Sequence, residues 1–85
     1  MIYNTSKIAV TTEGTEVTFD NSNFFDYWAV YPIDGDITVE IFSGGAYGGL
    51  IYGFNGVGIG DTFKGTKIRI KAISGTVNVA YYLRG

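Results

Sequence analysis

Apolar and polar residues alternate along most of this chain with a period of two, which is the pattern of β-strands that bury one face. The alternation is clearest in residues 7–19, 24–41 and 67–83, and a turn that contains glycine divides each of these segments. The three turns are Glu13-Gly14, Asp34-Gly35 and Ser74-Gly75. No run of sustained helical periodicity interrupts the pattern. The sequence therefore predicts antiparallel β-structure from one end of the chain to the other.

Each of the three segments can be folded as a tight hairpin in which apolar positions lie opposite one another. Turn length and the face that must be buried together fix strand register, so their agreement in three places favours three hairpins. The inward pairs expected from this register are Val10–Val17, Ile8–Phe19, Val30–Val39, Trp28–Ile41, Ala72–Val77, Ile70–Val79 and Ile68–Tyr81. Trp28 is accordingly assigned to the core. The polar cluster at residues 20–23 is expected to be a loop.

Seven or eight short strands at intervals of about ten residues are typical of an all-β sandwich or barrel. The length suits one domain, so residues 1–85 are predicted to form a single unit. We expect a compact antiparallel β-sandwich, jelly-roll-like or immunoglobulin-like, with a small β-barrel as the second choice. The chain contains no cysteine and thus no disulfide, so its hydrophobic residues, 46% of the total, must stabilise the fold.

The hairpin at Asp34-Gly35 leaves an aromatic set on its outward side, which is unusual for a small domain. This outward set consists of Phe25, Tyr27, Ala29, Tyr31 and Phe42. Two interpretations stay open: other segments of the same domain cover this face, or it is a contact surface for another protein or another copy. We assign the contact to four aromatic residues and to glycines that permit close approach of a backbone beside them. The assigned residues are Phe25, Tyr27, Tyr31, Phe42, Gly44, Gly45, Gly48 and Gly49.

The composition disfavours catalysis. The chain has neither histidine nor cysteine, which excludes Ser-His-Asp and Cys-His arrangements. Carboxylate pairs such as Asp34 with Asp36, or Asp26 with Glu40, are candidates, but aspartates beside a turn glycine are ordinary turn chemistry. Asp34, Asp36 and Asp61 could hold calcium only if their loops met. We therefore predict no enzyme activity, no catalytic residue, no cofactor and no metal site.

The charge distribution narrows the range of partners. A formal net charge of −2 disfavours extensive phosphate binding. Lys67, Arg69 and Lys71 form a cationic stripe near Tyr82 that would suit single-stranded nucleic acid, but charges on the solvent face of a strand also serve solubility. No segment approaches the roughly 18 apolar residues of a membrane span, and residues 1–7 lack the apolar run of a signal peptide. We expect no membrane partner, disfavour nucleic acid, and keep a glycan as an alternative partner.

Residues 34–40 (DGDITVE) and residues 67–83 (KIRIKAISGTVNVAYYL) carry a resemblance to a known class of proteins. With its short length, its lack of cysteine, its glycine and threonine content and its all-β pattern, the chain resembles the small accessory structural proteins of tailed bacteriophage virions, such as head-decoration proteins. The resemblance implies a non-enzymatic protein that self-associates and binds the capsid or tail surface. It assigns no role to a specific residue.

The sequence thus predicts a structural or assembly protein of a bacteriophage virion, such as a capsid decoration protein, that forms homo-oligomers through protein–protein contacts. Its expected partners are other copies of itself and a capsid or other virion protein. Its expected location is the virion surface, after synthesis in the cytoplasm of a bacterial host. The alternative is a small carbohydrate-binding β-sandwich module that uses surface tyrosines.

Overall fold

We describe the fold from a computed structural model, which covers residues 1–20 and 23–85. These residues form eight strands, as the sequence predicts. The strands are β1 (Tyr3–Val10), β2 (Thr15–Thr18), β3 (Phe25–Pro32), β4 (Ile37–Ser43), β5 (Ala46–Gly53), β6 (Ile59–Gly65), β7 (Lys67–Ala72) and β8 (Val77–Arg84). The predicted loop at residues 20–23 includes Asn21 and Ser22, which lie outside the described residues.

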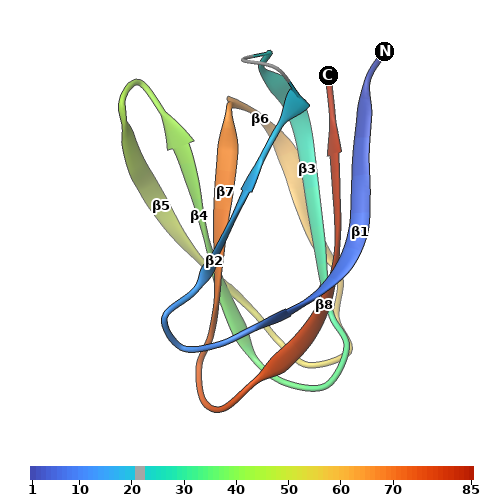
Figure 1. The fold of residues 1–85 in the computed structure, drawn as a ribbon, viewed down its shortest axis with the longest axis vertical. Coiled ribbons are helices and arrows are strands. Elements are labelled where there is room, and N and C mark those ends of the chain that lie inside the picture. The colour runs from blue at the N-terminus through green and yellow to red at the C-terminus, as the bar shows by residue number, and fades with distance from the viewer. Residues whose placement is uncertain (21–22) are drawn as a thin grey trace.

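The eight strands form two four-stranded sheets that pack face to face (Figure 1). Sheet A has the strand order β1-β8-β3-β6, and sheet B has the order β2-β7-β4-β5. Every strand pairing observed among the described residues is antiparallel. The predicted β-sandwich is therefore confirmed, in preference to the β-barrel.

The strand order has a simple origin in one long antiparallel ribbon. The chain turns back at Gly44-Gly45, so that β4 pairs with β5. Moving away from this turn along both arms, β3 pairs with β6, β2 with β7 and β1 with β8. Both turn glycines have positive φ, 64° and 87°, as a tight two-residue hairpin requires. Rolling the ribbon up brings β8 beside β3 and β7 beside β4. This is the jelly-roll arrangement, so the structure selects the first of the two predicted sandwich types.

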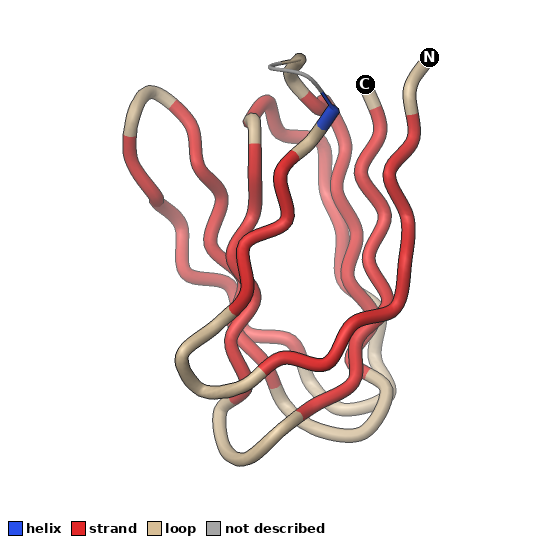
Figure 2. Tube along the Cα trace, in the orientation of Figure 1, coloured by secondary structure: helices blue, strands red, loops and turns tan. Residues whose placement is uncertain are grey.

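The three predicted hairpins are wrong. The turns at Glu13-Gly14, Asp34-Gly35 and Ser74-Gly75 connect β1 to β2, β3 to β4 and β7 to β8, and in each case the two strands belong to different sheets. Figure 2 shows these connections crossing between the layers at one end of the sandwich. A turn that connects one sheet to the other, which we call a corner, buries the same alternate residues as a hairpin does. In both cases each of the two strands directs one face toward the shared core. The alternation was therefore right, while the pairing inferred from it was not.

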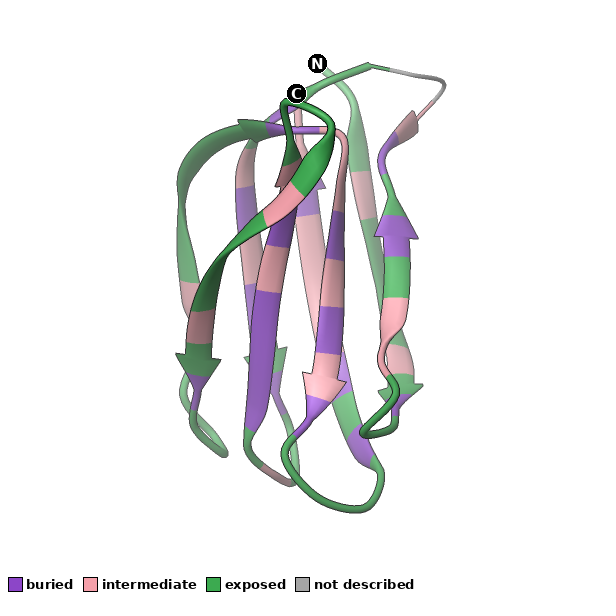
Figure 3. Ribbon diagram, turned by 90° about the vertical axis from the view of Figure 1, so that its left-hand side faces the viewer, coloured by how far each residue is buried: buried purple, intermediate pink, exposed green. Residues whose placement is uncertain are grey.

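The core confirms the inward set that the alternation predicts. Trp28 is 2% exposed, and the predicted pairs Val30–Val39 and Ile70–Val79 are buried between the sheets. Figure 3 shows buried and less buried residues alternating along β7. The whole buried apolar set is Val10, Val17, Phe19, Phe25, Trp28, Val30, Ile37, Val39, Ile41, Ile68, Ile70, Ala72, Val77, Val79 and Leu83.

Phe25 belongs to this core, which corrects its assignment to the outward set. The pairing of β3 with β6 shifts register between Phe25 and Tyr27, so Phe25 does not share the face of Tyr27. Phe25 is fully buried and packs edge-on against Phe19, with ring centroids 6.1 Å apart. A β-bulge changes the side to which a strand directs its residues, and the period-two pattern gave no sign of one here.

Candidate functional site

The structure separates the residues that the sequence placed on one contact surface. Tyr27 and Tyr31 lie on β3 in sheet A, whereas Phe42 lies on β4 in sheet B, so they occupy opposite outer faces of the sandwich. Phe25 is in the core. The predicted single aromatic face therefore does not exist, and each outer face has to be considered by itself.

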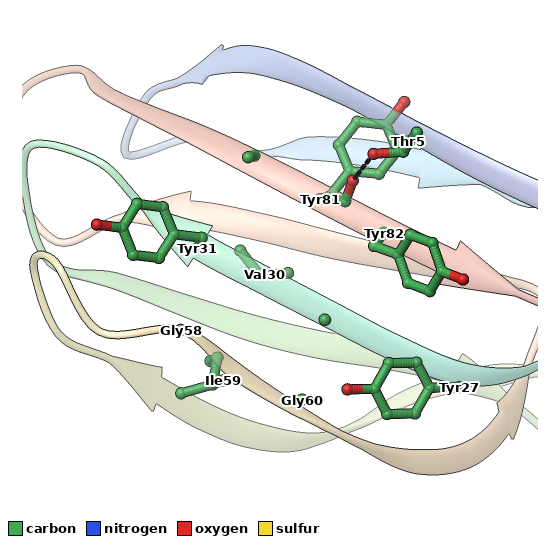
Figure 4. A pocket seen from close by; sticks show the side chains of 11 residues that line it. Thr5, Tyr27, Val30, Tyr31, Gly58, Ile59, Gly60, Tyr81 and Tyr82 are labelled. Atoms are coloured by element: carbon green, nitrogen blue, oxygen red, sulfur yellow. Dashed lines mark hydrogen bonds between the residues drawn. The ribbon is translucent and has the colours of Figure 1, made fainter.

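A groove lined by tyrosines crosses the outer face of sheet A (Figure 4). Its volume is about 410 Å³, and its side chains come from β1, β3, β6 and β8. Tyr27 packs edge-on against Tyr82, with ring centroids 6.1 Å apart, and Tyr82 in turn lies 5.7 Å from Tyr3. Tyr31 stands further along β3 and is 46% exposed. The groove thus has aromatic walls that belong to the two neighbouring strands β3 and β8.

The floor of the groove is low because small residues occupy it. Ala29 lies in register with Tyr82 on one side and with Gly60 on the other. Gly60 is required here: a Cβ at this position would lie 2.7 Å from the carbonyl oxygen of Trp28 and 2.9 Å from the Tyr27 hydroxyl. The Tyr27 side chain consequently reaches across the edge strand β6 and closes one end of the groove.

None of the residues that line this groove is charged. The Thr5 hydroxyl donates a 2.8 Å hydrogen bond to the Tyr81 carbonyl and so fixes the side chain at one margin. The guanidinium of Arg84 lies 4.9 Å from the Tyr27 ring centroid and 3.9 Å from the Asp26 carboxylate, so its charge is balanced outside the groove. The surface available to a ligand is therefore aromatic and hydroxyl-bearing but neutral.

The outer face of sheet B carries the predicted cationic stripe, and its three cations pair with two carboxylates. Lys67 lies 3.3 Å from Glu16, whereas Arg69 donates hydrogen bonds of 3.0 and 3.1 Å to Glu40. Lys71 also approaches Glu40, at 3.8 Å. The stripe is thus engaged within its own sheet, which removes the reason for assigning it to nucleic acid.

Phe42 is part of the same network. Its ring packs edge-on against Tyr47 at 5.2 Å, and the Lys67 ammonium lies 4.6 Å above it. Tyr47 also stacks under Arg69 and donates a hydrogen bond to Glu16. This hydrogen bond, followed by the one from Lys67, holds the pKa of Glu16 below its usual value. Burial and the bond to Glu16 raise the pKa of the Tyr47 phenol. Phe42 therefore packs within its own chain.

A second hollow, of about 290 Å³, lies between the two sheets on the side bordered by β5 and β6. Trp28 and Ile41 contribute to it from the core, and Phe63, which is 49% exposed, lies beside it. The inner face of β5 presents Gly48 in register with Ile41, and a Cβ at Gly48 would meet nothing within 4 Å. The sandwich is thus incompletely filled along this side, because two of the four β5 residues that line the hollow, Gly48 and Gly49, have no side chain.

The four glycines of the predicted contact, Gly44, Gly45, Gly48 and Gly49, all belong to the β4–β5 hairpin. A Cβ built on any of them would meet nothing within 4 Å. Beside them on the same edge, Leu50 is 54% exposed. These glycines are therefore open to approach from outside, on the edge of sheet B rather than beside the tyrosines of sheet A.

Two of the aspartates considered for catalysis or metal binding accept hydrogen bonds that hold loops in place. Asp34 accepts hydrogen bonds of 2.8 Å from both the backbone N–H and the side-chain amide of Asn78, which lower its pKa. Asp36 accepts one of 2.9 Å from the N–H of Asn55. Among residues 1–20 and 23–85, no group of three His, Cys, Asp or Glu side chains is placed to hold a metal ion. Asp26 and Glu40 lie in different sheets and do not form a pair.

Two further observations concern the described part of the chain as a whole. It contains no helix that is both long and apolar enough to cross a membrane. Its two sheets and its rolled ribbon define a jelly-roll sandwich.

The comparisons with known proteins support this fold. The chain is similar to a solved structure of Bacillus endospore appendages, described as a novel family of disulfide-linked pili. The TM-score is 0.56 and the sequence identity 18%, over 96% of this chain and 84% of the other. At that identity the likeness concerns the fold alone. No protein-family model matches the sequence, and no curated protein is significantly similar to it.

Proposed function

We propose that this protein is a non-enzymatic structural subunit that associates with copies of itself along the edge strand β5. One observation carries the proposal: β5 is eight residues long, contains no charged residue, and leaves Leu50 and Tyr52 54% and 59% exposed. Phe54, directly after the strand, is 63% exposed. Figure 3 shows β5 at the edge of sheet B as a mostly exposed strand.

An edge strand presents unpaired backbone donors and acceptors, and monomeric proteins protect such edges with charges, with short strands or with covering loops. The other three edges of this sandwich follow that rule, because β1 carries Lys7, β6 carries Lys64, and β2 is four residues long and carries Glu16. Strand β5 carries no charge and is not short, and its pairing with β4 contains one irregularity, the register shift between Val39 and Ile41. The uncharged residues of β5 are typical of an edge strand that pairs with a strand of another molecule.

The hollow beside β5 strengthens the argument. It is lined mainly by apolar residues, among them Trp28, Ile51 and Phe63, with Asp61 as its charged lining residue, and it can take an apolar side chain of a neighbouring copy. Burying that surface would add to the backbone hydrogen bonds of a strand added at β5. The edge and the hollow together therefore form a contact with both main-chain and side-chain components.

The fold comparison agrees with a self-assembling subunit, since the similar structure belongs to a pilus. Those pili are disulfide-linked, whereas the 85 residues of this chain contain no cysteine. Assembly of this chain would therefore depend on non-covalent contacts. On the ground of the sequence resemblance, we propose that the assembly lies on the surface of a bacteriophage virion. A capsid protein or another virion protein would be the second partner there.

Sedimentation velocity at about 10 µM to about 1 mM protein tests the proposal, because self-association depends on concentration. The wild-type protein should sediment as oligomers at the upper end of this range, and Leu50→Lys should sediment as a monomer because it adds a charge to the edge. Ile73→Lys is the matched control, since Ile73 is 51% exposed in a loop away from β5. A wild-type protein that stays monomeric, or equal effects of the two substitutions, would overturn the proposal.

A further inference from the structure

We infer that the tyrosine groove on sheet A is a binding site for a neutral oligosaccharide, a function separate from self-association at β5. The groove is lined by Tyr27, Tyr31 and Tyr82, with Thr5 at one margin and Gly60 in the floor. It lies on the opposite sheet from β5, so the two sites do not overlap.

The neutral lining identifies the chemical class of the ligand. A phosphate or carboxylate ligand needs a cation, but neither neighbouring cation lines the groove. Arg84 is engaged by Asp26 and by the Tyr27 ring, and Lys7, the register partner of Ala80, lies on the adjacent strand β1. In the described structure, the hydroxyls of Tyr27, Tyr31 and Tyr82 form no hydrogen bond with another side chain. A purely apolar ligand would therefore cover these hydroxyls without giving them a hydrogen-bond partner. A sugar ring combines an apolar C–H face with hydroxyl groups around its rim. That combination matches aromatic rings that end in hydroxyls.

The geometry suits a ring-shaped ligand. Tyr27 and Tyr31 are four residues apart on one strand, which places their Cα atoms about 13 Å apart. The two aromatic walls enclose a floor made of Ala29, Ala80 and Gly60, over which a ring can lie with contacts of about 4 Å on either side. The volume of about 410 Å³ lies within the range of small-molecule sites and leaves room for more than one sugar unit.

The rigidity of the walls favours binding. Tyr27, Tyr82 and Tyr3 form a continuous aromatic row across β3, β8 and β1, and each ring is supported by the next. Gly60 leaves the room that the Tyr27 hydroxyl occupies, since a Cβ there would lie 2.9 Å from it. Side chains that are already held in place lose little conformational entropy when a ligand binds. The wall made by Tyr27 and Tyr82 is therefore formed before the ligand arrives.

The test is calorimetric titration of the full chain with cellotriose, maltotriose and chitotriose, each to about 10 mM. We expect saturable binding of at least one of these sugars. Tyr31→Ala should weaken it about tenfold or more, and Tyr31→Phe, which keeps the ring, should retain most of the affinity. Phe24→Ala is the matched control, because Phe24 is an aromatic residue of similar exposure, 51% against 46% for Tyr31, that does not line the groove, and it should leave the affinity unchanged.

Three results would overturn the inference: no saturable binding of any of the three sugars, binding that Tyr31→Ala leaves intact, or binding that Phe24→Ala weakens as much as Tyr31→Ala. Repeating the titration with Leu50→Lys separates the two proposals. This variant should keep the affinity of each groove for the sugar whether or not the wild-type protein assembles, because Leu50 does not line the groove.

Discussion

A disulfide between β1 and β8 would test the rolled-ribbon topology directly. Lys7 and Ala80 are register partners on the outer face of sheet A. Facing residues on antiparallel strands have Cα atoms about 4.5–5.5 Å apart, within the range of about 4.4–6.8 Å that a disulfide spans. The chain has no cysteine of its own. The double variant Lys7→Cys, Ala80→Cys should therefore form a single, well-defined crosslink.

The expected stabilisation is large because the closed loop is long. A loop of about 73 residues removes loop-closure entropy worth about 4.4 kcal/mol from the unfolded chain in the entropic model. A domain of 85 residues typically has a total stability of about 4–13 kcal/mol. Even a third of the ideal gain, about 1.5 kcal/mol, would raise Tm by about 6–12 °C.

The measurement is a pair of thermal unfolding curves, oxidised and reduced, with mass spectrometry to confirm the crosslink. The control is Lys7→Cys, Asp20→Cys, which joins the two positions that a hairpin at Glu13-Gly14 would place opposite each other. In the structure Lys7 lies in sheet A, whereas Asp20 follows β2 of sheet B. Ready oxidation and a higher Tm for the control pair, without either for the Lys7–Ala80 pair, would refute the topology.

Two further predictions concern single residues. Gly65→Ala should lower the free energy of unfolding in urea by about 1–3 kcal/mol, because its Cβ would lie 2.8 Å from the Phe25 ring. Gly48→Ala is the control: its Cβ would have no atom within 4 Å, so it should not lower the stability. Asp34 has a folded pKa below its usual 3.8, so it stabilises the fold above that pH and loses this contribution as the pH falls through the lowered pKa. Asp34→Asn keeps one of the two acceptor oxygens, which can still accept from the Asn78 N–H, and no longer titrates. It should therefore lose less stability than wild type between about pH 6 and about pH 3, and an equal loss would contradict this assignment.

The side of each strand that faces the core was predictable because it depends on local alternation. Trp28, Val39 and Ile70 are buried as expected, since a single alternation fixes the inward face whichever strands are paired. Strand pairing was not predictable from the same signal. A turn such as Ser74-Gly75 serves equally as a hairpin or as a corner between sheets, and the choice depends on how the whole ribbon rolls up. That is a non-local property.

One true hairpin did carry a local signal. Gly44-Gly45 between Phe42 and Tyr47 is a two-residue glycine turn, and both positions have positive φ. The surrounding glycines interrupt the alternation of apolar and polar residues that would mark a full-length strand over Ala46–Gly53. The length of β5, and hence the exposed edge that we assign to self-association, was missed for the same reason.

The tyrosine groove could be predicted only in part. Tyr27 and Tyr31 were placed outward correctly because they alternate with Trp28 and Val30 on one strand. Tyr82 was assigned to the wrong neighbour, since the predicted hairpin placed it beside Lys67, whereas β8 in fact pairs with β3. A cluster assembled from strands 55 residues apart in sequence is visible only once the sheet order is known.

The two proposed sites complement one another because of where they lie. The outer face of sheet B is occupied by its own ion pairs and stacked rings, so it offers little to a partner. Copies joined at the β5 edge extend sheet B sideways and leave the groove on sheet A facing outward. A repeated array of grooves can bind a surface that carries many glycans about 10²–10⁴ times more tightly than a single groove does. A shallow site with modest affinity is therefore sufficient in a subunit of an assembly, where it would not be in an isolated domain.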